Sequence, residues 1–241
     1  MNSEDQTPQE MSVVGKIISI FVSPTETFRS LDQKPTWLVP YIIIIIFITV
    51  AQFMALDIQI SDRIAMMQTQ DIPADRMEEA QAQAQGPLKY VGIVMTPIVL
   101  PIVWAVLAGI LLLTANMMIG HVEGVNFKKI FSVVAWSSVV SLLGIILATY
   151  ITLSKGTAYG VGTDLAPLIG TPPIGEPKSL LYRLMSKLDI MTIWQLILWT
   201  FGLSVMYKVT TKKAAIPVVT LWIIWIVISV ALGGALAQFG V

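Results

Sequence analysis

Five long apolar stretches constrain this chain more than any other feature of its sequence. A helix rises about 1.5 Å per residue, so roughly 20 apolar residues cross a hydrocarbon core about 30 Å thick. Because lipid offers no partner for a free backbone amide, each crossing segment has to be helical. We therefore predict an all-α membrane protein, a five-helix transmembrane bundle with spans at about 37–56, 91–119, 130–153, 190–207 and 216–239.

Composition supports a membrane protein and excludes several other classes. Hydrophobic residues make up 55% of the chain and charged residues 12%, against about 45–50% and about 25% in soluble domains. A net charge of zero gives no support to nucleic-acid binding. The absence of Cys excludes thiolate chemistry, and the single His121 excludes a two-His metal site. With no ionised side chain in the middle of a span, we predict a non-enzymatic protein without cofactor or metal.

The chain divides into a disordered polar N-terminus at 1–10, amphipathic interfacial helices at 11–34 and the five-span bundle at 35–241. The first ten residues carry no Lys or Arg, which argues against a signal peptide. The stretch 11–22 is apolar but too short to span, and we expect it to lie on the membrane surface. Ser23 and Glu26 have the spacing of a capping box, which predicts a second short helix from Pro24.

Two polar segments join the spans on one side of the membrane. Residues 58–89 have helical composition on both sides of Pro73. Residues 154–188 are rich in Gly and Pro between Gly156 and Pro177, which predicts an irregular exposed segment. The apolar spacing at 179–187 then predicts a short helix that leads into the fourth span.

Charge in the short loops predicts the orientation of the bundle. The loop 208–215 carries three Lys and no acid, and Lys128 and Lys129 follow the second span. The loops on the opposite side are longer and contain most of the acidic residues. Because positive charge in short loops marks the cytoplasmic side, we predict a multi-pass protein of the cell membrane, with the N-terminus in the cytoplasm and the C-terminus outside.

Polar residues inside the spans are the first candidate site. Gln52, Asn116 and Gln195 lie within spans, and Asp189 marks the outer end of the fourth. Such residues are costly in lipid and are functional candidates by default. They have two interpretations, which the sequence leaves open: they line a path across the membrane, or they form hydrogen bonds between helices.

Two further sets of residues are candidates for contacts outside the bundle. A lysine patch on the cytoplasmic side, a candidate site for lipid headgroups or a partner, comprises Lys128, Lys129, Lys208, Lys212 and Lys213. Its alternative role is only to fix topology. Small residues that recur at helical spacing, candidates for helix packing or self-association, are Ser137, Ser141 and Gly144 in the third span and Ser229 and Gly233 in the fifth. Pro97 and Pro101 predict a bend in the second span.

The order of several short motifs resembles a known family. The motifs are Ser23-Pro24-Thr25-Glu26-Thr27-Phe28 with Pro35 and Trp37, Gly124–Lys129 followed by Phe131–Ser137, Leu188–Trp194, Gly202-Leu203 and Lys213-Ala214. In this order, and with five spans, the chain resembles a bacterial member of the YIP family, the Ypt/Rab-GTPase-interacting five-span membrane proteins. The resemblance implies a cytoplasmic N-terminus and no catalysis.

The resemblance also bears on partners. Eukaryotic YIP proteins act in vesicle traffic and contact prenylated Rab GTPases, through a longer N-terminal region with an Asp-Leu-Tyr-Gly-Pro motif. That motif is absent here, so the resemblance does not extend to a Rab-type GTPase partner. The partners we predict are the lipid bilayer and either a protein partner or a second copy of the chain.

The leading hypothesis is a non-enzymatic membrane protein that organises the bilayer or recruits partners, in a trafficking-like role. A small-solute channel or transporter is the first alternative, suggested by Pro97, Pro101, Asn116 and Gln195. A subunit of a larger membrane complex is the second, suggested by the small-residue stripes and the segment 154–188.

Overall fold

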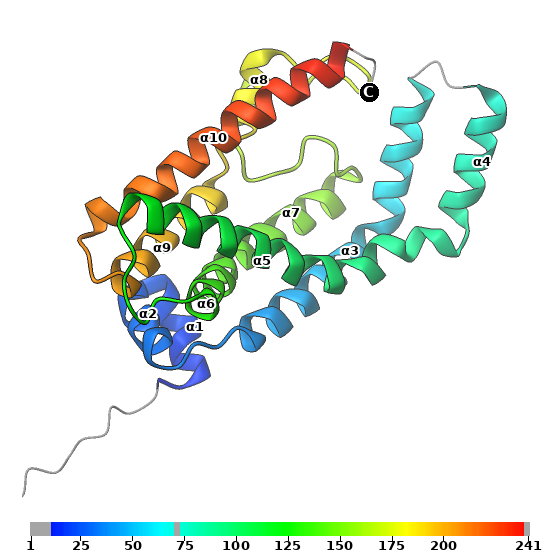
Figure 1. The fold of residues 1–241 in the computed structure, drawn as a ribbon. Coiled ribbons are helices and arrows are strands. Elements are labelled where there is room, and N and C mark those ends of the chain that lie inside the picture. The colour runs from blue at the N-terminus through cyan, green and yellow to red at the C-terminus, as the bar shows by residue number, and fades with distance from the viewer. Residues whose placement is uncertain (1–10, 70–72, 239–241) are drawn as a thin grey trace, which may run out of the picture.

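The computed structural model describes residues 11–69 and 73–238, and every regular element in that part of the chain is a helix (Figure 1). The α-helices are α1 (Val13–Val22), α2 (Pro24–Gln33), α3 (Leu38–Gln68), α4 (Ala74–Gln85), α5 (Val91–Met118), α6 (Phe127–Ser137), α7 (Ser141–Lys155), α8 (Leu180–Met185), α9 (Ile190–Met206) and α10 (Thr211–Gln238). Three 3₁₀ turns are η1 (Pro87–Tyr90), η2 (Ser138–Val140) and η3 (Ala166–Ile169). The predicted all-α helical bundle is confirmed. The predicted disordered segment 1–10 and residues 239–241 lie outside the described residues.

Four helical stretches of the described chain are long and apolar enough to cross a bilayer: Leu38–Gln68, Pro87–Met118, Phe127–Lys155 and Thr211–Leu232. They correspond to the predicted spans one, two, three and five. The fourth predicted span is the 17-residue helix α9, which is about 25 Å long. That length falls short of a hydrocarbon core of about 30 Å, but α9 packs between α2, α6 and α10 and belongs to the bundle.

The third span forms the centre of the bundle. In its apolar window 61% of the residues are buried, compared with 11–22% in the other three long helices. The sequence predicts one continuous helix here, whereas the structure has α6 and α7 joined by the 3₁₀ turn η2. The outer helices carry large exposed apolar side chains such as Phe53, Val106 and Ile224. These faces suit lipid rather than water, because a bilayer is as apolar as the side chains that meet it.

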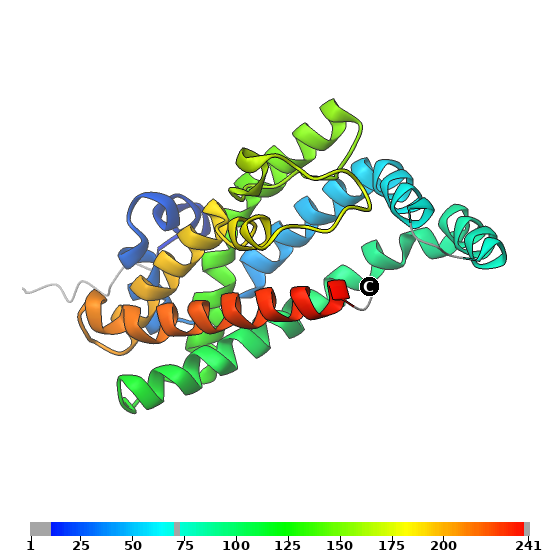
Figure 2. The same cartoon turned by 90° about the horizontal axis from the view of Figure 1, so that it is seen from above.

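The helices α1 and α2 pack against one end of the bundle, which we call the α1–α2 end. The turns between α5 and α6 and between α9 and α10 lie at the same end (Figures 1 and 2). Ile20, Phe28 and Leu31 are fully buried there. The side chain of Lys129 at the start of α6 forms an ion pair with Asp32 of α2, with 2.6 Å between Nζ and Oδ1.

The start of α2 shows how the capping prediction fails in detail. The helix begins at Pro24, as predicted, but the side chain of Ser23 accepts no capping hydrogen bond. Instead the backbone carbonyl of Ser23 accepts from the amide of Glu26 at 3.0 Å and from the hydroxyl of Ser19 at 2.9 Å. The tight turn between α1 and α2 gives Ser23 a φ of −148° and a ψ of 62°, so its carbonyl is bound by groups from both helices.

The opposite end, which we call the α4 end, holds the two long polar segments. The predicted helices on both sides of Pro73 are the last turns of α3 and the antiparallel α4. The chain between α7 and α8 is irregular apart from η3, and the short helix predicted at 179–187 is α8. Asp62 of α3 fixes this segment, because its carboxylate accepts from the Thr157 hydroxyl at 2.9 Å and the Ala158 amide at 2.7 Å.

Candidate functional site

The three amide side chains inside the spans each form a hydrogen bond to another helix. Gln195 Nε2 of α9 donates to the hydroxyl of Ser138 in η2 at 2.8 Å. The carbonyl oxygen of the Asn116 side chain in α5 accepts from the Tyr207 hydroxyl, at the end of α9, at 2.8 Å. Gln52 Nε2 of α3 donates to Thr96 Oγ1 of α5 at 3.0 Å. These bonds support the helix-packing interpretation of the three amides, and they leave the residues apart from one another in the bundle.

Asp189 joins the α4 end to the start of α9. Its carboxylate caps the helix by accepting from the Thr192 amide at 2.6 Å, and it also accepts from the Thr163 hydroxyl. The amide of Ile190 donates to the Thr163 carbonyl at 3.2 Å. Asp189 therefore holds the irregular segment against the bundle.

A tyrosine completes the backbone hydrogen bonding of the proline-containing helix α5. Pro101 has no N–H, so the carbonyl of Pro97, four residues earlier, lacks the donor that an α-helix normally supplies. The Tyr41 hydroxyl of α3 donates to this carbonyl at 2.8 Å. The proline pair thus creates an acceptor in the bundle, and the neighbouring helix satisfies it.

Tyr41→Phe tests this arrangement. Because a buried carbonyl left without a donor costs about 1–3 kcal/mol, we expect the free energy of unfolding to fall by about 1–2 kcal/mol. In a Pro101→Ala background, the new amide at 101 supplies the missing donor, so the same tyrosine substitution should cost about 1 kcal/mol less. Unfolding in SDS–detergent mixtures, followed by tryptophan fluorescence, measures both. An equal cost in the two backgrounds contradicts the pairing.

The small residues of the predicted stripes face different neighbours. Ser137 is fully buried and Ser141 half-buried in the third span. A Cβ on Gly144 would come within 2.9 Å of Met191 Cγ, so this glycine permits α7 and α9 to pack closely. Ser229 donates within its own helix to the Ile226 carbonyl at 3.1 Å. Gly233 lies on α10, in the part whose side chains are not described.

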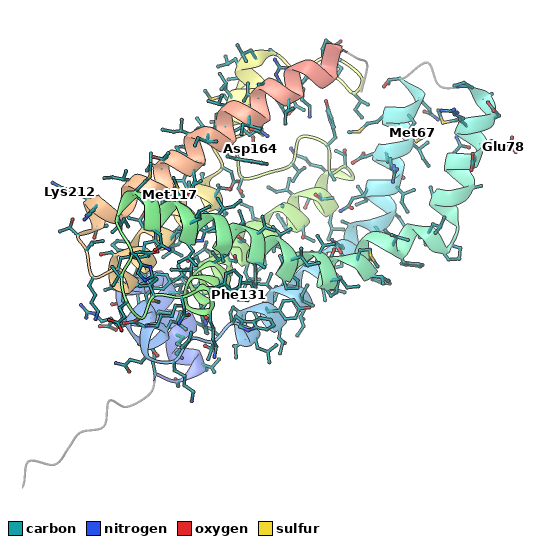
Figure 3. The ribbon with its side chains drawn as sticks, in the orientation of Figure 1. Met67, Glu78, Met117, Phe131, Asp164 and Lys212 are labelled. Atoms are coloured by element: carbon teal, nitrogen blue, oxygen red, sulfur yellow. The ribbon has the colours of Figure 1, made fainter. Side chains whose placement is uncertain are left out.

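The lysine patch lies at the α1–α2 end, where α6 begins and α10 follows α9 (Figure 1). Lys128, Lys208, Lys212 and Lys213 are exposed, while Lys129 is engaged by Asp32. Figure 3 labels Lys212 at this end of the molecule. Four of the five predicted lysines therefore present their charge to the surroundings.

The sequence placed the first helix at the membrane surface, but it did not single out the residues of its outward face. Val14, Ile18 and Val22, spaced four residues apart, expose 65%, 58% and 76% of their surfaces. Lys16 and Ser19 of the same helix are buried against the rest of the protein. The i, i+4, i+8 spacing is visible in the sequence, but which face of the helix is buried depends on its packing with α2.

At the α4 end two neighbouring clefts contact the outer part of α3. One, of about 430 Å³, lies between α3, α4, η1 and the start of α5. The other, of about 250 Å³, is lined by Asp62, Arg63 and the segment that follows α7. In the second cleft the Lys178 ammonium lies 5.9 Å and 5.8 Å from the ring centres of Tyr159 and Tyr182. Burial, followed by Tyr182 and Glu176, raises the pKa of Tyr159.

The sequence did not reveal these clefts, because their walls come from segments far apart along the chain. Among the described residues there is also no group of three or more His, Asp or Glu side chains that could hold a metal ion. The charged side chains described above therefore lie at the two ends of the molecule. Between them, interhelical hydrogen bonds join the helices beside a cleft of about 290 Å³ between α3 and α7.

Comparison with known proteins identifies the family. The family model described as the Yip1 domain matches residues 18–233. The chain belongs to the Yip1 domain family. The resemblance to YIP proteins is thereby confirmed, and the apolar helices make this Yip1-family member a multi-pass membrane protein. Neither a curated protein nor a solved structure matches the chain.

The extent of the match also shows that the N-terminal helices belong to the Yip1 domain. It begins at Ile18, inside α1, and ends at Gly233, inside α10. The second half of α1 and all of α2 are therefore part of the Yip1 domain. This agrees with their packing, since α2 contacts both α6 and α9.

Proposed function

We propose that this Yip1-family protein organises the cytoplasmic leaflet of its membrane by inserting α1 as an apolar wedge beside a patch of lysines. The proposal includes the orientation predicted from the loops, with the α1–α2 end in the cytoplasm. The observation that carries it is the outward apolar face of α1, formed by Val14, Ile18 and Val22.

A helix that meets water at a protein surface normally turns its polar face outward. α1 is apolar on its outward face as well as around the buried Ile20, and exposing its three outward aliphatic side chains to water costs about 25 cal/mol per Å² of apolar surface. Insertion of this face into the boundary between headgroups and acyl chains removes that cost. Lipid at this depth is therefore the medium that suits α1.

The exposed lysines favour anionic lipid around the wedge. Each Lys close to an anionic surface contributes about 1 kcal/mol, and Lys128, Lys208, Lys212 and Lys213 are exposed at this end. The long helices already anchor the protein, so insertion of α1 is not needed for attachment. Its effect is to add area to one leaflet only, which favours curvature of the membrane.

Replacing the three aliphatic residues tests the proposal. Wild-type protein reconstituted at high density in vesicles with phosphatidylglycerol should narrow or tubulate them, as seen by cryo-electron microscopy. The triple variant Val14→Ser, Ile18→Ser, Val22→Ser no longer inserts this apolar surface, and each 80 Å² that it loses weakens interfacial binding by about 2 kcal/mol. Vesicles that contain it should therefore keep the diameters of protein-free liposomes.

Glu26 and Arg29, which are exposed on the neighbouring helix α2, supply the matched control. The double variant Glu26→Gln, Arg29→Gln keeps the apolar face of α1 and the net charge of the pair, so it should remodel vesicles as the wild type does. The proposed role of α1 is contradicted if the triple variant remodels vesicles as the wild type does, or if the wild type does not remodel them.

A further inference from the structure

The larger cleft at the α4 end has an amphipathic lining. Its walls are apolar, with Leu56, Ile60, Leu88 and Val91 contributed by α3, η1 and α5. Two cations, Arg63 and Lys89, line the same cleft, and no carboxylate of the described residues does. Its volume of about 430 Å³ falls in the range of about 300–1,000 Å³ that is typical of small-ligand sites.

The level of the cleft coincides with the expected edge of the hydrocarbon core. Leu56 ends the first predicted span and Val91 begins the second. Arg63 lies seven residues beyond Leu56, or about 10 Å along the helix, and the headgroup layer on each side of a bilayer is about 5–8 Å thick. Because helical side chains lean toward the N-terminus of their helix, Arg63 leans back toward that layer.

The two cations of the cleft are available for an anion. In the described part of the chain neither Arg63 nor Lys89 forms an ion pair, although the Lys89 ammonium lies 5.1 Å from the ring centre of Tyr90. The nearest acid on α3, Asp62, lines only the second cleft, where its carboxylate accepts from Thr157 and Ala158. Glu78 does not line the cleft, and Figure 3 shows it on the outer side of α4, whereas Met67 of the cleft wall is on α3.

The floor of the cleft is defined by the contact between α3 and α5. The hydrogen bond from Gln52 to Thr96 joins the two helices at 3.0 Å, and Tyr41 joins them again further down. Above Gln52, residues Leu56 and Gly92 line open space instead. The opening therefore starts above the contact between Gln52 and Thr96, and Arg63 and Lys89 line it further out.

We propose that this cleft binds one anionic phospholipid from the leaflet at the α4 end, with its phosphate between Arg63 and Lys89 and the upper part of one acyl chain along Ile60, Leu88 and Val91. The proposal concerns the opposite end of the molecule from α1 and does not depend on the wedge function.

The test is lipid retention by the purified full-length protein. Protein in nanodiscs of equal parts phosphatidylglycerol and phosphatidylcholine is released into mild detergent, and native mass spectrometry counts the lipids that remain. We expect one retained phosphatidylglycerol on the wild type. Removal of both cations in Arg63→Gln, Lys89→Gln should lower its retention about tenfold or more, because two charge-assisted hydrogen-bonding groups are lost.

Two further variants separate charge, shape and folding. Arg76→Gln, Lys155→Gln removes the same charge from exposed positions that do not line the cleft, so it should retain lipid as the wild type does. Ile60→Trp fills the apolar part of the cleft without changing its charge, so this variant should also lose the lipid. The double variant Arg63→Lys, Lys89→Arg keeps both positive charges and should retain the lipid. Unfolding midpoints establish that each variant is folded.

The outcomes assign the source of the anion as well. Excess glycerol 3-phosphate should not displace the lipid, because it lacks the acyl chain that the apolar wall holds. Displacement by glycerol 3-phosphate, equal retention of phosphatidylcholine, or undiminished retention by the Arg63 and Lys89 double variant overturns the proposal. The α1 triple variant should still retain phosphatidylglycerol, so failure of the wedge function and failure of this site are distinguishable.

Discussion

Replacing Gly202 by alanine is expected to destabilise the protein by about 1–3 kcal/mol, the usual cost of overpacking a filled core. Gly202 lies in α9 at its crossing with α6, and both helices are buried there. A Cβ at this position would come within 2.3 Å of Val133 Cγ1 and 3.0 Å of Cγ2. Neither atom has room to move, because Val133 is itself fully buried, so the two helices have to separate.

A second substitution makes this prediction specific to one contact. Val133→Ala removes both clashing methyl groups, so the double variant Gly202→Ala, Val133→Ala should be more stable than the sum of the two single changes predicts, by about 1 kcal/mol or more. Gly109→Ala in α5 is the matched control, since a Cβ there meets no atom within 4 Å and alanine favours helix. SDS titration followed by tryptophan fluorescence compares the four variants with the wild type. Simple additivity, or an equal loss at Gly109, contradicts the tight crossing of α6 and α9.

This crossing also shows what the sequence could not reveal. Hydropathy alone located the apolar helices, because the requirement for backbone hydrogen bonding in lipid acts on each segment separately. The break between two helices near Pro73 and the irregular segment from Gly156 were also visible, and Gly156 follows α7 with the positive φ of 68° that glycine tolerates. Gly202, by contrast, belongs in the sequence only to the short motif Gly202-Leu203. The structure alone shows that it packs against Val133.

For the candidate residues, too, the sequence reveals the residues themselves and only the structure reveals their partners. The polar residues Gln52, Asn116 and Gln195 could be found because they interrupt apolar runs, but their partners Thr96, Tyr207 and Ser138 lie on other helices. Arg63 and Lys89 lie in the polar segment 58–89, where no sequence motif marks them as a site. They line one cleft only because α4 and η1 bring the chain back beside α3, which no local pattern predicts.

Replacing Phe28 by alanine is the change expected to separate the N-terminal helices from the bundle. Phe28 lies in α2, is fully buried, and belongs to the same core as Leu31, Ile130 and Leu198. Loss of a buried Phe side chain costs about 3–5 kcal/mol. α1 and α2 are short, at 10 residues each, and isolated helices of this length are only marginally stable. We therefore expect the loss to fall mainly on their attachment, with the long helices intact.

Limited proteolysis with trypsin in detergent distinguishes local release from global unfolding. Cleavage after Arg29 should accelerate about tenfold or more, in line with a loss above 1.4 kcal/mol, while cleavage after Arg76 on α4 should keep its wild-type rate. Phe53→Ala is the matched control, because the same side chain on α3 is 65% exposed to the lipid-facing side and contributes little to the core.

Because α1 is held through α2, the Phe28 variant should also lose membrane remodelling while Val14, Ile18 and Val22 are all present. Remodelling at the wild-type level by a protein whose α2 has been released would show that the apolar residues act without a fixed orientation, and the wedge mechanism would then be wrong.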